Sequence, residues 1–208
     1  MAKTPRSERG SVAAGGPRAR LFVALDLPEE ARRALGAWRD ELLAGRPDLR
    51  PARQEQLHVT LAFLGWQRES DIEAIAAAAF EAARGFAPPR LTAACVRGLP
   101  PRAPRLFALD LADQNGRAGA LQGAIAGSLA QGGHFRPERR PFWPHITLAR
   151  VKRGAKVPSL PGLAPPPEPI NAAELTLYRS TLRPQGALYE PLARRRLAGG
   201  ENAVRGPS

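Results

Sequence analysis

A four-residue pattern that occurs twice constrains this chain more than any other feature of its sequence. Residues 58–61 and 145–148 both read His-apolar-Thr-Leu, although the whole chain has only 3 histidines. Side chains in a strand alternate between two faces, so a histidine and the threonine two residues later share a face, about 7 Å apart. Each motif therefore predicts a strand that presents two polar groups to one ligand.

The two motifs belong to an internal repeat. Arg20-Leu21-Phe22-Val23-Ala24-Leu25-Asp26 resembles Arg105-Leu106-Phe107-Ala108-Leu109-Asp110, at an offset of 85 residues between the leucines and 87 between the motif histidines. In each half a helical pattern separates the Leu-Phe strand from the His-x-Thr strand. The halves, about residues 20–65 and 105–151, predict an α+β fold. We expect a bilobal molecule in which two pseudo-twofold-related β-α-β lobes hold antiparallel sheets around a central groove.

Hydrophobic periodicity predicts the other elements. Helices are expected over residues 29–45, 70–84 and 115–131, and strands over 90–96, 105–111, 172–182 and 187–197, the last two as a hairpin around Pro184-Gln185-Gly186. In the first motif strand, Leu57, Val59, Leu61 and Phe63 are expected on one face and His58, Thr60, Ala62 and Leu64 on the other. Residues 20–197 are predicted to be a single domain between a disordered basic tail (1–19) and a flexible tail (198–208), with a surface loop over 152–169.

Composition limits the class of protein. The chain has no apolar run near the roughly 20 residues that span a bilayer, and no signal peptide precedes its first strand, so we expect a cytoplasmic protein without membrane contact. A monomer is expected because nothing in the sequence suggests an exposed apolar face. Of the net charge of +12, residues 1–20 carry +4 and residues 194–208 carry +3, which leaves weak support for a phosphate-bearing partner. The single cysteine, Cys95, has apolar neighbours that predict a buried thiol rather than a nucleophile.

Two histidines in equivalent positions favour a joint chemical role. A lone histidine on a strand is usually structural, and His134, in Gly132-Gly133-His134-Phe135, has neither motif and is expected in a loop. Zinc needs about three or four protein ligands, and no cysteine cluster or carboxylate adjoins either motif, so we expect neither metal nor cofactor. The chain also lacks Gly-x-Ser-x-Gly and a Gly-rich phosphate loop.

Paired acid–base catalysis remains as the interpretation. Histidine titrates near neutrality, so one copy can accept a proton while the other donates one. The threonine hydroxyls, next on the same face, can donate hydrogen bonds to phosphoryl oxygens as charge develops. The repeat itself does not assign which histidine is the acid.

The chain resembles the 2H phosphoesterase superfamily and, within it, is similar to the bacterial RNA 2′,3′-cyclic phosphodiesterases, also called 2′-5′ RNA ligases. The resemblance covers about residues 20–197 and rests on residues 20–30, 57–65, 140–150, 174–180 and 189–192. It implies metal-independent hydrolysis, in RNA processing, of an RNA or nucleoside 2′,3′-cyclic phosphate to a 2′-phosphate. It also implies that His58 is the proton donor, that His145 is the proton acceptor, and that Thr60, Thr147 and Arg150 hold the phosphate.

Three further side chains near the motifs are candidates for substrate binding. Arg150 lies five residues after His145, so it reaches the face of His145 only through a strand end or a bulge. Phe142 and Phe63 are the candidates for stacking on a base, with Phe142 the better of the two. Trp143 could stack as well, although core packing is the commoner role for all three.

Two other functions are also compatible with the sequence. The same groups can run the reaction in reverse and join RNA ends by a 2′-5′ bond. A basic groove with basic tails is also compatible with an RNA-binding module without turnover.

Overall fold

In the part of the chain that the structure describes, three α-helices combine with two antiparallel sheets. A computed structural model describes residues 16–157, 159–184 and 186–198. Its elements are, in order, β1 (Arg18–Asp26), α1 (Glu29–Leu42), β2 (Leu49–Pro51), η1 (Gln54–Gln56), β3 (His58–Arg68), η2 (Glu69–Asp71), α2 (Ile72–Ala82), β4 (Arg90–Leu99), β5 (Leu106–Asp113), α3 (Arg117–Gln131), β6 (His145–Val151), β7 (Ile170–Asn171), β8 (Glu174–Arg183) and β9 (Gly186–Arg196). The predicted α+β fold with antiparallel sheets is confirmed.

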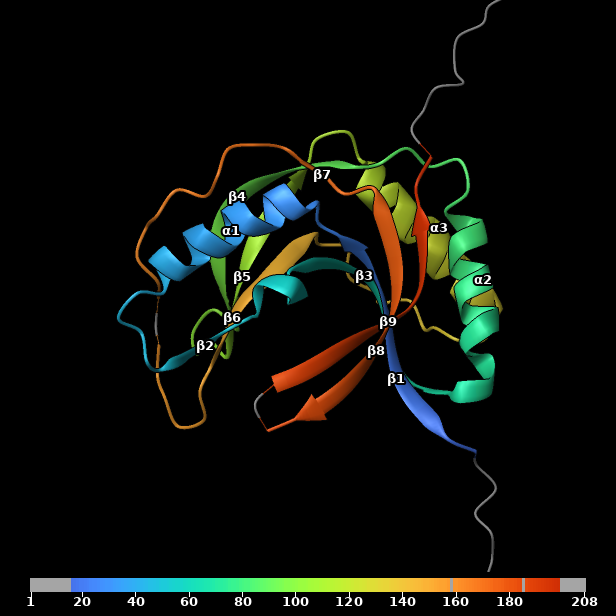
Figure 1. Ribbon diagram of the computed structural model, residues 1–208, viewed down its shortest axis with the longest axis horizontal. Helices are drawn as coiled ribbons and strands as arrows, with labels where there is room; N and C mark the ends of the chain where they lie inside the picture. Colours follow the sequence, from blue (N-terminus) through green and yellow to red (C-terminus); the bar gives the residue numbers. More distant parts are fainter. Residues whose placement is uncertain (1–15, 158, 185, 199–208) are drawn as a thin grey trace, which may run out of the picture.

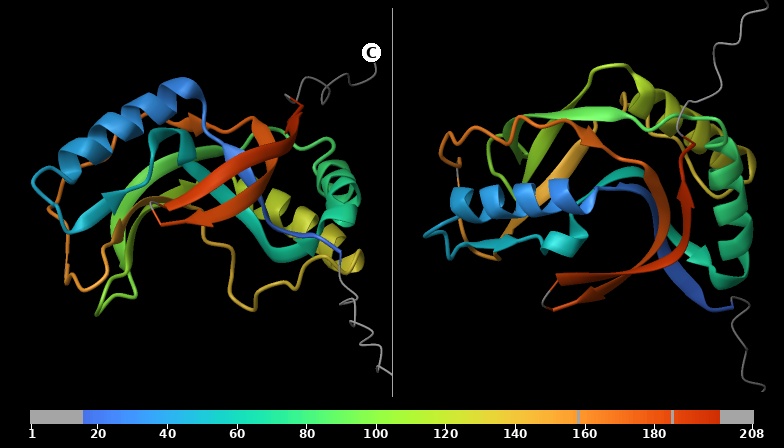
Figure 2. Two further views of the ribbon diagram at one scale, coloured as in Figure 1. Left: turned by 60° about the horizontal axis from the view of Figure 1, so that its bottom comes forward. Right: turned by 45° about the horizontal axis from the view of Figure 1, so that its top comes forward.

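Each sheet contains one of the two motif strands. The first sheet has the order β3-β1-β8-β9 and the second the order β2-β6-β5-β4-β7. Figures 1 and 2 show the β8–β9 hairpin extending from the first sheet toward the side where β2 lies. There the Arg50 guanidinium donates a 3.3 Å hydrogen bond to the Pro184 carbonyl, and the Gln56 amide donates one of 2.7 Å to the Ala187 carbonyl. The hairpin that follows the second repeat therefore links the two lobes.

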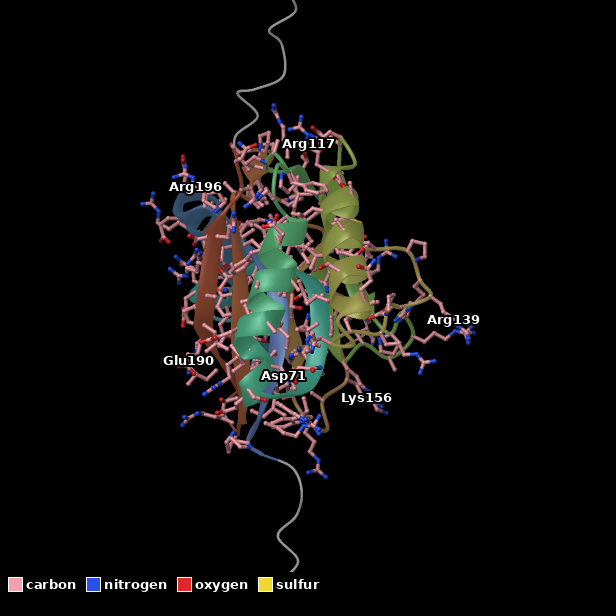
Figure 3. The ribbon with its side chains drawn as sticks, turned by 90° about the vertical axis from the view of Figure 1, so that its right-hand side faces the viewer. Asp71, Arg117, Arg139, Lys156, Glu190 and Arg196 are labelled. Carbon is pink, nitrogen blue, oxygen red and sulfur yellow. The ribbon has the colours of Figure 1, made fainter. Side chains whose placement is uncertain are left out.

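The helices lie on the outside of the sheets. Figure 3 shows α2 and α3 side by side along one flank, and α1 lies on the other side of the molecule in Figure 1. The apolar faces of all three helices join one buried core, which includes Leu35 of α1, Ile75 of α2 and Ile125 of α3. This core fixes the inward faces of β1, β3, β5 and β6, so their opposite faces are left for the groove.

The predicted repeat is present in the hydrogen-bond register. β1 pairs with β3 so that Asp26 lies opposite His58, and β5 pairs with β6 so that Asp110 lies opposite His145. The two aspartates are the last residues of the repeated segments found in the sequence. Equivalent strands therefore hold each histidine beside an equivalent carboxylate.

Several boundaries differ from the predicted ones. β1 begins at Arg18, two residues earlier than expected, and the short strands β2 and β7 were not predicted. β2 has three residues and β7 has two, too few for a hydrophobic period. Residues 1–15 and 199–208 of the predicted tails, and Gln185 of the predicted turn, lie outside the described residues.

The predicted burial of Cys95 is wrong, because its thiol is exposed. The prediction depended on the apolar neighbours of Cys95, but the pairing of β4 with β5 is irregular between Ala93 and Val96, and Cys95 lies in this bulge. The thiol lies 3.5 Å from an Asp110 carboxylate oxygen, and desolvation together with that carboxylate raises the pKa of Cys95. A raised pKa leaves less thiolate, which argues against a nucleophilic role.

None of the helices in the described ranges is long and apolar enough to cross a membrane. The cytoplasmic location stays a prediction.

Candidate active site

One groove collects every candidate residue that the sequence proposed. It has a volume of about 1660 Å³ and is lined from both sheets and from the loop before β6. The seven candidates on its wall are His58, Thr60, Phe63, Phe142, His145, Thr147 and Arg150. The pseudo-twofold arrangement therefore brings the two motifs into one cavity, as the repeat predicted.

A bulge follows each motif threonine and decides which side chains reach the groove. In β3, Thr60 pairs with Ala24 and Ala62 with Val23, so Leu61 is the extra residue. In β6, Thr147 pairs with Ala108 and Ala149 with Phe107, so Leu148 is the extra residue. Each bulge reverses the alternation of the residues that follow it.

The residue five positions after each histidine is thereby turned into the groove. Arg150 lines the groove because of the bulge at Leu148. Such a bulge was expected, since Arg150 lies an odd number of residues after His145 and would otherwise point to the opposite face. Phe63 pairs with Phe22 and also lines the groove, so its predicted position on the face opposite His58 is wrong. The bulge at Leu61 is the cause, because simple alternation does not anticipate an inserted residue. Arg150 and Phe63 are thus equivalent positions with different chemistry.

Both histidines are oriented by the main chain two residues before them. The Nδ1 atom of His58 lies 2.7 Å from the Gln56 carbonyl oxygen, and the Nδ1 atom of His145 lies 2.8 Å from that of Trp143. A carbonyl only accepts, so each Nδ1 carries the proton and donates it. This leaves Nε2 of each ring for proton transfer, and in His58 that atom lies 3.0 Å from the Thr60 hydroxyl.

His58 lies among aromatic rings. Phe22 stacks on it at 5.0 Å between centroids, and Tyr189 meets it edge-on at 5.5 Å. Desolvation by these surroundings is the main cause that lowers the pKa of His58 to about 4, and the nearby charge of His145 adds to it. The hydrogen bond to Gln56 and the charge of Asp26 oppose the shift without cancelling it. His58 is therefore neutral at pH 7 in the free protein.

His145 has a different neighbourhood. Its ring stacks on the Trp143 ring with 4.1 Å between the ring centroids and 13° between the ring planes. The Arg97 guanidinium lies 5.4 Å from the centre of the Trp143 ring, and all three side chains line the groove. Arg97 also donates to Asp110, the carboxylate paired with His145 in the sheet. A cation, an indole and a carboxylate thus surround the second motif.

The equivalent carboxylate beside His58 is held by hydroxyl groups. Tyr178 and Thr176 each donate a 2.7 Å hydrogen bond to Asp26, which is 8% exposed. Desolvation and Asp26 raise the pKa of Tyr178 above its ordinary value, so the phenol stays a donor over the whole range in which proteins are usually studied. Asp26 is therefore fixed by neutral donors.

The charged lining of the groove is almost entirely basic. Its wall includes one glutamate, Glu138, and seven arginines: Arg20, Arg50, Arg53, Arg97, Arg140, Arg150 and Arg183. Such a wall attracts an anion, and guanidinium groups match the geometry of phosphate oxygens. Across the described ranges, no three His, Cys, Asp or Glu side chains are grouped so that they could hold a metal ion.

Sequence reasoning missed several residues that shape the site. Phe22, Tyr178, Tyr189 and Arg97 lie around the histidines and were not proposed as site residues. For Arg97 no sequence signal existed, since it lies outside the repeat. Asp26 and Asp110 were visible as the matched ends of the repeat, although their pairing with the histidines was not.

Comparison with known proteins shows which family the chain matches. The family model described as "LigT like Phosphoesterase" matches residues 25–105 and 113–189. The chain belongs to this family. It is therefore a phosphoesterase, and the resemblance to the 2H phosphoesterases noted from the motifs is confirmed.

Similar proteins match over nearly the whole chain. An RNA 2′,3′-cyclic phosphodiesterase of Thermus thermophilus is 34% identical over 197 residues, which are 90% of this chain and 96% of the relative. The Escherichia coli protein of the same name is 31% identical over 190 residues, covering 84% and 94%.

Solved structures agree with the family assignment. A crystal structure of a Thermus thermophilus protein matches with a TM-score of 0.74 and 30% identity, over 87% of this chain and 99% of that one. Escherichia coli LigT in complex with 3′-AMP matches with a TM-score of 0.67 and 29% identity, also over 87% and 99%.

Proposed function

We propose that this phosphoesterase hydrolyses 2′,3′-cyclic phosphates at RNA ends, or in small cyclic nucleotides, to 2′-phosphates without a metal ion. The observation that carries the proposal is the convergence of two His-x-Thr strands on one arginine-lined groove. The names of the relatives and the bound 3′-AMP in LigT support the same substrate class. We further expect a cytoplasmic monomer.

The two histidines divide the proton transfers. His58 Nε2 protonates the departing 3′ oxygen, while His145 Nε2 takes a proton from the attacking water. Since His58 is neutral in the free protein at pH 7, the negative charge of the bound phosphate must raise its pKa before it can donate. Thr60, Thr147 and Arg150 hold the phosphoryl oxygens, where donors stabilise the charge of the transition state.

The size of the groove favours RNA over a free nucleotide as substrate. Sites for small molecules usually measure about 300–1,000 Å³, and this groove is about 1660 Å³. Phe63 and Phe142 on its wall offer surfaces for bases. Room for two RNA ends also supports 2′-5′ ligation as a second reaction of the same groups, because a 5′-hydroxyl can replace water.

Incubation with 2′,3′-cyclic AMP in EDTA, followed by separation of the 2′- and 3′-monophosphates, tests the proposal. We expect 2′-AMP as the sole product at a rate that the chelator does not change. Formation of 3′-AMP would contradict the assigned leaving oxygen. Activity lost in EDTA and restored by zinc would contradict the metal-free mechanism. Binding of RNA without turnover of 2′,3′-cyclic AMP or of an RNA that ends in a 2′,3′-cyclic phosphate would instead favour an RNA-binding module.

A further inference from the structure

β3 carries exposed aromatic side chains past its His-x-Thr motif. Phe63 is 46% exposed and Trp66 is 59% exposed, whereas Trp38 in the core is 7% exposed. β3 is an edge strand of its sheet, with β1 as its one neighbour there. Large aromatic side chains on an open strand are the type of surface on which nucleobases stack.

The register places both rings on the face of the catalytic motif. Opposite residues of an antiparallel pair share a face, and His58, Phe63 and Trp66 lie opposite Asp26, Phe22 and Arg20 in turn. Asp26, Phe22 and Arg20 are separated by even numbers of residues on β1, so they share a face. On the other face, the Gln67 amide donates to the Leu64 and His134 carbonyls, away from the groove. Trp66 therefore follows Phe63 on a line that leads away from His58.

The spacing of these rings suits successive nucleotides of a single strand. Phe63 and Trp66 lie opposite Phe22 and Arg20, which are two positions apart on β1, so the two rings are separated by about 7 Å along the strand. Trp66 is not among the residues that line the groove, so it lies past the end of the cavity that holds the phosphate site. A chain that leaves the groove along β3 meets Phe63 first and Trp66 second.

Basic side chains accompany the two rings. The Arg20 guanidinium lies 4.5 Å from the centre of the Phe63 ring, which leaves the other face of that ring for a base. Arg18 and Arg68, both exposed, lie opposite each other at the end of the two strands. The nearby carboxylate of Glu69 is paired with Arg179 at 3.2 Å. Aromatic rings between cations form the usual surface for a single-stranded nucleic acid.

We propose that Trp66 binds the base of the nucleotide that precedes the cyclic phosphate end of a single-stranded RNA, whose terminal base stacks on Phe63. The inference rests on the proposed function, since the phosphate site fixes where the 3′ end lies. It implies that the enzyme prefers a substrate with upstream nucleotides to a cyclic mononucleotide. In this arrangement Arg68 contacts the phosphate of the upstream nucleotide.

The test compares kcat/KM for a trinucleotide ending in a 2′,3′-cyclic phosphate with kcat/KM for 2′,3′-cyclic AMP. In the wild-type protein the trinucleotide should be preferred, and Trp66→Ala should lower that preference on the order of tenfold, as expected for the loss of one stacked base. Trp66→Phe should keep most of it. Leu188→Ala, which shortens an exposed apolar side chain on β9 outside the groove, is the matched control and should leave the preference unchanged.

Salt dependence gives a second, independent readout. Arg68→Gln should reduce the slope of log kcat/KM against log salt for the trinucleotide by about 0.7, the value for one phosphate contact on a single strand. Equal kcat/KM for both substrates in the wild type, or a preference that Trp66→Ala does not change, would overturn the inference while the proposed function stands. Failure of the wild type to hydrolyse either substrate would instead overturn the proposed function.

Discussion

The two halves of the molecule place His58 and His145 in the same backbone frame but in different chemical surroundings. Each histidine is held through Nδ1 by a carbonyl two residues earlier, and each faces an aspartate across the sheet. Around His58 stand Phe22 and Tyr189, whereas His145 stacks on Trp143 alone in the described structure. The backbone hydrogen bond and the opposite aspartate are therefore the same in both halves, whereas the aromatic neighbours of the two histidines differ.

Strands that lie outside the repeat add to these differences. β8 and β9 supply Tyr178 and Tyr189 to the first half, and β4 supplies Arg97 to the second. The repeat therefore sets the backbone geometry around the two histidines, while the added strands help to give each histidine its own environment. An acid and a base need different proton affinities, and this division provides a route to them from identical motifs.

The largest expected effect tests what the two halves share. Thr60→Val and Thr147→Val each remove one hydroxyl that we propose donates to the phosphate, and each should lower kcat for 2′,3′-cyclic AMP by about 10²–10³-fold. Thr181→Val, on the exposed side of β8, is the control and should retain wild-type kcat. A loss of less than threefold in either motif variant would mean that its half does not contact the reacting phosphate.

The lowered pKa of His58 should appear in the pH dependence of stability. Its folded pKa of about 4 lies below the ordinary value of 6.5, so the unfolded chain binds a proton that the folded chain does not. The free energy of unfolding should then fall by about 3 kcal/mol as the pH drops from 6.5 to 4, and this dependence should be absent in His58→Gln.

Urea unfolding of both proteins across that range measures the difference, since other titrating groups are common to them. Parallel curves for the wild type and the variant would contradict the desolvation of His58 by its surroundings.

A smaller effect should separate the two aspartates. Tyr178→Phe leaves the buried Asp26 without one donor and should destabilise the protein by about 1–3 kcal/mol. Arg97→Gln breaks an ion pair whose arginine side chain is 54% exposed, which should cost less than about 1 kcal/mol. Thermal unfolding of both variants checks the order, and an equal loss of stability would show that the two carboxylates are held alike.

The sequence predicted the repeat and the motif residues because both are local patterns with a fixed period. Alternation placed Phe63 on the wrong face because of the bulge at Leu61, and apolar neighbours placed Cys95 in the core although it lies in the bulge between Ala93 and Val96. Bulges depend on pairing with distant strands, which a single sequence does not reveal. Arg97 and Tyr178 were missed for the same reason, because they reach the site only through tertiary pairing.

The account depends most on His58 and His145 acting as one acid–base pair. The most direct test is the rate of 2′-AMP formation from 2′,3′-cyclic AMP by His58→Asn, His145→Asn and the double variant, with His134→Asn as control. We predict that each single variant loses at least about 10²-fold in kcat and that the double variant is little worse, because the two groups work as a unit. A motif variant that turns over at a rate near that of the control would contradict the paired mechanism.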